Sequence, residues 1–104
     1  MTTVVVVDEA EEQLREINEW WIANRQAAPS LVVDEFERCV TLLENSPDIG
    51  TIFHRTNVPG ARRLLMKKTK HLLYYVHDDN NAVVYIVAVW GAPKGGDPDL
   101  RDPR

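Results

Sequence analysis

The side chains with the greatest capacity for chemistry gather in one basic stretch, residues 54–71. It contains six Lys or Arg residues and two His residues, His54 and His71, but no Asp or Glu. The other 6 basic residues and all 16 acidic residues lie outside it and give the rest of the chain a formal charge of −10. This segregation predicts a cationic surface for an anionic partner, either nucleic acid or an acidic protein segment. The alternative is a solvated sheet edge that Lys and Arg protect from aggregation.

Metal and cofactor chemistry find no support in the residue pattern. The three histidines are scattered along the chain, outside any metal-ligand spacing, so we expect no metal site. The single cysteine, Cys39, excludes an internal disulfide and a zinc site built from cysteines. It falls within a helical pattern, which predicts a buried thiol. We therefore expect no cofactor.

Length and composition predict one ordinary globular domain. The chain has 104 residues, of which 44% are hydrophobic and 27% are charged. Its longest apolar runs are too short to cross a bilayer, and no basic segment followed by an apolar one begins the chain, so we expect a cytoplasmic protein. The acidic body argues against general nucleic-acid binding, and no direct sequence-specific DNA binding is expected.

Residues 58–90 predict three consecutive antiparallel strands. The strands cover Arg62–Lys68, His71–His77 and Ala82–Trp90, and they are joined by Thr69–Lys70 and by the polar turn 78–81. Both faces of the last strand are apolar, so both need cover. Val83, Tyr85, Val87 and Val89 are predicted to share one face, and Val84, Ile86, Ala88 and Trp90 the other.

The N-terminal residues predict a strand followed by a helix. The β-branched run Thr2–Val7 indicates a strand that is buried on both faces and therefore lies well inside the sheet. Asp8 is predicted to cap a helix that extends to about Asn24, with Glu11 completing a capping box.

A second helix, with Pro29 in its first turn and a stop at Ser46-Pro47, completes an antiparallel helical hairpin. The order β-α-α-β-β-β predicts an α+β domain over residues 1–91, with both helices on one face of a mostly antiparallel sheet. Because one hairpin covers one face, the second apolar face is expected to be exposed to a partner. Residues 92–104 are rich in Gly and Pro, and we expect a tail that is extended or disordered when alone.

Five short motifs follow one another in a recognisable order. They are A-x3-L-x2-I-x2-W-W at Ala10–Trp21, L-x3-P-x2-G at Leu43–Gly50, P-G-A-R-R-L-L at Pro59–Leu65, L-x-Y-Y at Leu72–Tyr75 and V-x-I-x-A-V-W-G ending at Gly91. Together they resemble the RelE/ParE toxin superfamily of bacterial type II toxin–antitoxin modules. The resemblance implies the fold predicted above and a partner antitoxin whose C-terminal segment wraps the toxin.

The superfamily contains two activities, and the resemblance distinguishes between them. The RNase branch typically places an arginine on the strand that matches Leu72–Tyr75, another just after the final strand, and a tyrosine or histidine in the tail. Here the first position is Leu72, the second falls near Ala92, and residues 93–104 contain neither Tyr nor His. The resemblance therefore implies the ParE-like branch, whose members poison DNA gyrase by binding and without bond chemistry of their own.

Two alternatives remain open beside a ParE-like toxin. The first is a RelE-like, ribosome-dependent endoribonuclease that uses the cations and histidine of the basic stretch, namely Arg62, Lys67, Lys70 and His71. The second is a module that folds and binds its antitoxin but is no longer toxic.

The predicted contact surface combines cations with aromatic anchors, the residue types that dominate interface energetics. It consists of Trp20, Trp21, Arg55, Arg62, Arg63, Lys67, Lys70, Tyr74 and Trp90. Its expected partners are a ParD-like antitoxin and DNA gyrase, and no catalytic residue is predicted within it.

Overall fold

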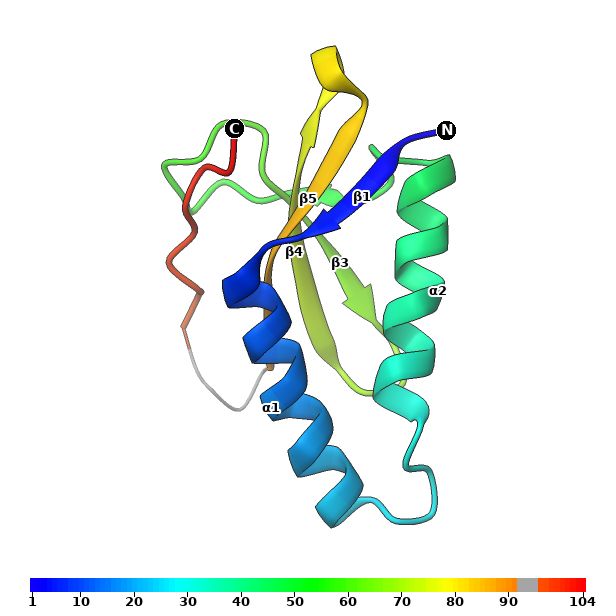
Figure 1. Cartoon of the computed structure of the whole chain (residues 1–104). Helices are drawn as coiled ribbons and strands as arrows, with labels where there is room; N and C mark the ends of the chain where they lie inside the picture. Colours follow the sequence, from blue (N-terminus) through cyan, green and yellow to red (C-terminus); the bar gives the residue numbers. More distant parts are fainter. Residues whose placement is uncertain (92–95) are drawn as a thin grey trace.

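Two helices pack on one face of a five-stranded sheet in the computed structural model (Figure 1), which describes residues 1–91 and 96–104. The strand order is β1-β5-β4-β3-β2, and every neighbouring pair is antiparallel except β1 and β5. This confirms the predicted α+β fold. The elements are β1 (Thr3–Val6), α1 (Asp8–Asn24), α2 (Leu31–Asn45), β2 (Thr51–Ile52), β3 (Arg62–Met66), β4 (His71–Asp78), the short 3-10 helix η1 (Asp79–Asn81) and β5 (Val83–Gly91).

The first strand lies at the edge of the sheet, so the prediction of a central position is wrong. Among the described strands β1 pairs with β5 alone, and Val5 is 39% exposed. Val4, Val6 and Val7 are partly buried and pack against the core beneath the helices. The continuous valine run therefore reflects one buried face and an exposed apolar residue, rather than burial on both faces.

The starts of both helices also differ from the prediction. Asp8 is the first helical residue, and Val7 occupies the cap position with extended backbone and no side-chain hydrogen bond, so the predicted capping box does not form. Acidic residues in the first turn still face the positive end of the helix dipole. Pro29 precedes the second helix, which begins at Leu31 after Ser30.

A β-bulge between β4 and β5 shifts the alternation of side chains along the last strand. Tyr74 pairs with Ala88 and Tyr75 pairs with Ile86, so Val87 is an extra residue on β5. The extra residue reverses the alternation of the side chains that follow it. Val87 still shares a face with Tyr85 as predicted, but the predicted grouping of the two faces is wrong from Ala88 onward.

Two cores lie on opposite faces of the sheet. The helix-side core consists of Ala10, Phe36, Cys39, Leu43, Met66, Leu73, Tyr75, Val84, Ile86 and Val89. Cys39 is buried there as predicted, and burial raises the pKa of its thiol. The second-face core consists of Phe53, Val58, Ala61, Tyr74, Val76, Val87, Ala88 and Leu100.

The second face of the sheet is largely covered by the chain itself, which corrects the expectation of an open apolar face. Phe53 and Val58 reach over it from the loop before β3, and Leu100 reaches over it from the C-terminal residues. Residues 96–104 form no helix or strand. An ion pair of 2.8 Å between Arg55 Nε and Asp97 Oδ2 holds them against this loop. Residues 92–95 of the predicted tail lie outside the described residues.

Candidate partner-binding site

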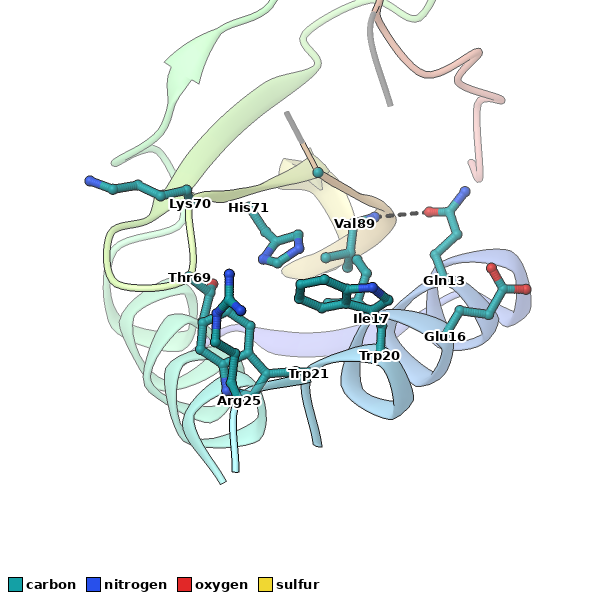
Figure 2. A pocket seen from close by; sticks show the side chains of 11 residues that line it. Gln13, Glu16, Ile17, Trp20, Trp21, Arg25, Thr69, Lys70, His71 and Val89 are labelled. Atoms are coloured by element: carbon teal, nitrogen blue, oxygen red, sulfur yellow. Dashed lines mark hydrogen bonds between the residues drawn. The ribbon is translucent and has the colours of Figure 1, made fainter. Parts of the chain in front are cut away.

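A pocket of about 570 Å³ opens where the C-terminal half of α1 meets the β3–β4 turn and the ends of β4 and β5 (Figure 2). Its lining is mainly apolar, with polar groups at its two ends. Arg25 and Lys70 lie at one end, and Gln13 and Glu16 lie at the other. The remaining lining residues are Ile17, Trp20, Trp21, Thr69, His71, Val89 and Gly91.

The helical wall of the pocket is built from two tryptophans and an arginine. The Trp21 ring is fixed because its Nε1 donates a hydrogen bond of 2.8 Å to the Ala28 carbonyl. The Arg25 guanidinium lies 5.3 Å from the centre of the Trp20 ring and 5.8 Å from that of Trp21, within the range of a cation–π interaction. Trp20 remains 53% exposed. The wall therefore presents a supported but open aromatic surface beside a positive charge.

The opposite wall is a turn that a buried carboxylate holds in place. Glu35 of α2 is only 3% exposed, and it accepts hydrogen bonds from the backbone N–H groups of Lys68 (2.9 Å) and Thr69 (2.8 Å). Burial by itself would raise the pKa of Glu35, but these hydrogen bonds, with the positive charge of Arg38, hold it below its ordinary value. Glu35 is therefore an ionised anchor that fixes the turn on α2.

The turn presents three cations that have no acidic partner among the residues that the structure describes. Within residues 1–91 and 96–104, no carboxylate lies within ion-pair distance of Lys67, Lys68 or Lys70. Arg25 also has no acidic partner in that part of the chain. The positive charges of Arg25 and Lys70, which line this end of the pocket, are therefore available to a partner.

Lys70 occupies a backbone conformation that favours glycine, with φ of 65°. Replacing Lys70 by glycine is expected to raise the free energy of unfolding by about 0.5–1 kcal/mol, because relief of the Cβ clash exceeds the added freedom of the unfolded chain. Ala82, with φ of 52° and ψ of 47°, is a matched site away from the pocket. Ala82→Gly should give a similar gain in urea unfolding, and a loss of stability in both variants would contradict this account of strain.

His71 lies on the floor of the pocket near the turn. Its Nδ1 is buried without a hydrogen-bond partner among the described residues. Burial lowers the pKa of the imidazole, and the nearby Glu35 carboxylate offsets only part of this effect. His71 is therefore neutral at pH 7.

The arginines of the predicted contact surface lie away from the pocket and have partners within the chain. Arg55 pairs with Asp97, as described above. The Arg62 guanidinium donates hydrogen bonds to the carbonyl oxygens of Asp48 (3.1 Å) and Gly50 (2.8 Å). The Arg63 guanidinium lies 5.6 Å from the centre of the Phe53 ring. Arg55 and Arg63 thus contact the segments that cover the second face, whereas Arg62 holds the loop between α2 and β2.

Two predicted aromatic contacts also lie on the second face, outside the pocket. Tyr74 is 1% exposed beneath Phe53, with the ring centres 5.0 Å apart, and so it is not available on the surface. Trp90 is half-buried, and its Nε1 donates to the Gly96 carbonyl at 3.3 Å. Trp90 aligns across the sheet with Leu72, which aligns in turn with Leu65. This apolar row, Leu65, Leu72 and Trp90, ends in the 46% exposed side chain of Leu65.

Three residues of the predicted surface, Trp20, Trp21 and Lys70, therefore lie together in the pocket. Other residues of the pocket were not among those predicted from the sequence. Arg25 is the most important addition, and its position four residues after Trp21 is a helical spacing that could have identified it. Gln13 also belongs to the site, because its Oε1 accepts a hydrogen bond of 2.9 Å from the Val89 N–H and ties α1 to the end of β5 (Figure 2).

No group of His, Cys, Asp or Glu side chains among residues 1–91 and 96–104 could hold a metal ion. None of the helices in the same part of the chain is long and apolar enough to span a membrane.

Comparison with known proteins gives a family match and several similar folds. A family model described as the ParE toxin of the type II toxin–antitoxin system parDE matches residues 4–92. No curated protein matches the sequence significantly.

Similar solved structures include toxins and complexes of toxin–antitoxin systems. The chromosomal ParDE system from P. aeruginosa has a TM-score of 0.69 at 15% identity, covering 88% of this chain and 96% of that chain. The intact E. coli RelBE complex has a TM-score of 0.63 at 14% identity, covering 88% of this chain and 96% of that chain. The isolated E. coli RelE toxin has a TM-score of 0.62 at 14% identity, covering 99% of this chain and 89% of that chain. At such identities the likeness shows the fold alone.

Proposed function

The chain belongs to the ParE toxin family of type II toxin–antitoxin systems, and from this premise we propose that it inhibits DNA gyrase by binding. A ParD-like antitoxin neutralises it by covering part of its surface. Both interactions take place in the cytoplasm and need no cofactor. The chain acts through complementary surfaces, and it breaks no covalent bond itself.

The observation that carries this proposal is the apolar row Leu65, Leu72 and Trp90. Leu72 stands where the resemblance to the nuclease branch calls for an arginine, and its neighbours across the sheet are also apolar. Cleavage of RNA needs cationic donors at the phosphate and groups that move protons. A row of leucine and tryptophan supplies neither, whereas it suits a protein partner.

A RelE-like endoribonuclease is the second candidate, favoured by the similarity of fold to E. coli RelE. Of the residues proposed for it, Arg62 is engaged by two carbonyl oxygens. Burial lowers the pKa of His71, which suits a general base but not the general acid that must protonate the leaving oxygen. Lys67 and Lys70 remain as cations without an adjacent acid and base. For these reasons we place the endoribonuclease function second, after inhibition of a target by binding.

The test uses purified chain in two parallel assays. With DNA gyrase and relaxed plasmid, we expect loss of supercoiling and accumulation of cleaved DNA complexes. With translating ribosomes and a defined messenger RNA, we expect the RNA to stay intact. RNA cleavage that disappears in the double variant Lys67→Ala/Lys70→Ala, with gyrase unaffected, would overturn the proposal in favour of the nuclease.

A further inference from the structure

We propose that the pocket between α1 and the β3–β4 turn is the anchor site for an acidic segment of the antitoxin. In this arrangement an aromatic or long aliphatic side chain of the antitoxin fills the pocket. Carboxylates beside it pair with Arg25 and with the lysines of the turn. The inference rests on the proposed neutralisation by an antitoxin, and it names the surface and the chemistry through which the antitoxin is held.

The apolar part of the argument comes from Trp20. An aromatic side chain that is 53% exposed, at the mouth of a pocket, leaves a large apolar area in contact with water. Ile17 and Val89 continue this surface into the pocket. The volume of about 570 Å³ falls in the range of sites that enclose most of a ligand the size of a few side chains. Filling it would place Trp20 at the centre of an interface.

The electrostatic part of the argument identifies the occupant as acidic. Arg25 is held on the edge of this apolar surface by the two tryptophan rings, and Lys70 lines the same end of the pocket. Lys67 and Lys68 do not line the pocket but are exposed in the same turn. None of these cations has an acidic partner among the described residues, although acidic residues outnumber basic ones in the whole chain. Carboxylates of a partner therefore meet positive charge here, whereas the residues outside the basic stretch 54–71 carry a formal charge of −10.

Nucleic acid fits this pocket less well than an acidic peptide. Phosphate groups would meet the cations, but the lining between them is aliphatic and aromatic, and Glu16 occupies the far end. A strongly basic surface is the usual footprint of nucleic-acid binding, and the chain as a whole carries a formal charge of −4. The position of Lys70 adds to the case for a specific contact, since a side chain is retained in a conformation that favours glycine.

Binding of the ParD-like antitoxin of the same module, measured by isothermal titration calorimetry, tests the inference with two matched pairs of variants. Trp20→Ala removes the aromatic anchor, and Ile22→Ala removes an apolar side chain that is 47% exposed on the same helix outside the pocket. Lys70→Glu reverses a charge at the pocket, and Arg101→Glu reverses an exposed charge elsewhere. We expect Trp20→Ala and Lys70→Glu each to weaken binding at least tenfold and both controls to stay within twofold of wild type.

Each outcome bears on a different statement. If the wild-type chain binds the antitoxin and both pocket variants match their controls, the anchor site is wrong while the proposed function stands. If the wild-type chain does not bind the antitoxin, the proposed neutralisation falls, and the anchor site falls with it. If the pocket variants keep antitoxin binding but lose inhibition of gyrase, the pocket belongs to the target, which also overturns the inference. Unchanged far-ultraviolet circular dichroism of all four variants verifies that they fold.

Discussion

Glu35→Ala is expected to lower the free energy of unfolding by about 3 kcal/mol, because it leaves the buried N–H of Thr69 and the partly buried N–H of Lys68 without their acceptor. Glu35→Gln should cost less, since its amide oxygen can keep one of the two hydrogen bonds. Glu37→Ala is the matched control, because Glu37 is exposed on the same helix. Urea unfolding at pH 7 measures all three, and equal stability of Glu35→Ala and Glu37→Ala would contradict the assigned role.

The same carboxylate predicts a dependence of stability on pH. Because the pKa of Glu35 is lower in the folded chain than its ordinary value, its ionised form is favoured by folding. Its contribution to stability is therefore complete above that ordinary value and is lost as the pH falls through the lower, folded-state value. The Glu35→Gln variant lacks this titration, so the difference in stability between wild type and variant should shrink in acid. A difference that stays constant from neutral to acidic pH would show that Glu35 does not titrate in this way.

Gly50→Ala is expected to lower the free energy of unfolding by about 2–3 kcal/mol, because there is no room for a side chain. An added Cβ would lie 2.7 Å from the Tyr75 hydroxyl oxygen and 2.8 Å from the Arg63 carbonyl oxygen. The Gly50 N–H also donates a hydrogen bond of 2.8 Å to that hydroxyl. Since this contact ties the loop after α2 to β4, the variant displaces both.

Two further variants separate crowding from backbone conformation. Tyr75→Phe combined with Gly50→Ala removes the hydroxyl but leaves the Arg63 carbonyl, so we expect only a partial rescue. Gly60 has φ of 75°, and no atom of the described residues lies within 4 Å of an added Cβ. Gly60→Ala should therefore cost about 1 kcal/mol from conformation alone. Thermal unfolding of these variants measures the order of their stabilities. A Gly50→Ala variant as stable as wild type would exclude the close packing around Gly50.

The sequence predicts well those parts of the fold in which apolar residues recur at a regular spacing over a whole helix or strand. Both helices repeat apolar residues at helical spacing, and the strands after Arg62 alternate with β-branched and aromatic residues, so their existence and order follow. Glu35 also carried a signal, because it lies three residues after Val32 and four before Cys39, on the buried stripe of α2. A carboxylate on such a stripe indicates a buried acceptor.

The remaining differences between the predicted and the observed structure arise from contacts between distant segments, which a local sequence pattern does not reveal. A bulge adds one residue, Val87, and only the pairing with β4 reveals where the alternation reverses. The cover of the second face comes from Phe53, Val58 and Leu100, which are isolated apolar residues in segments without a period. The candidate site joins α1 to a turn that follows it by more than forty residues in the chain, so the meeting of Trp20 with Lys70 depends on the tertiary fold.

The central statement, that this chain inhibits a target by binding and does not cleave RNA, is tested most directly in cells that express it alone. Synthesis of new DNA and new protein is followed by pulse-labelling in the first minutes after induction. An early stop in DNA synthesis, while translation continues, is the predicted result. An early stop in translation, with DNA synthesis continuing, would contradict the account and direct attention to Lys67, Lys70 and His71.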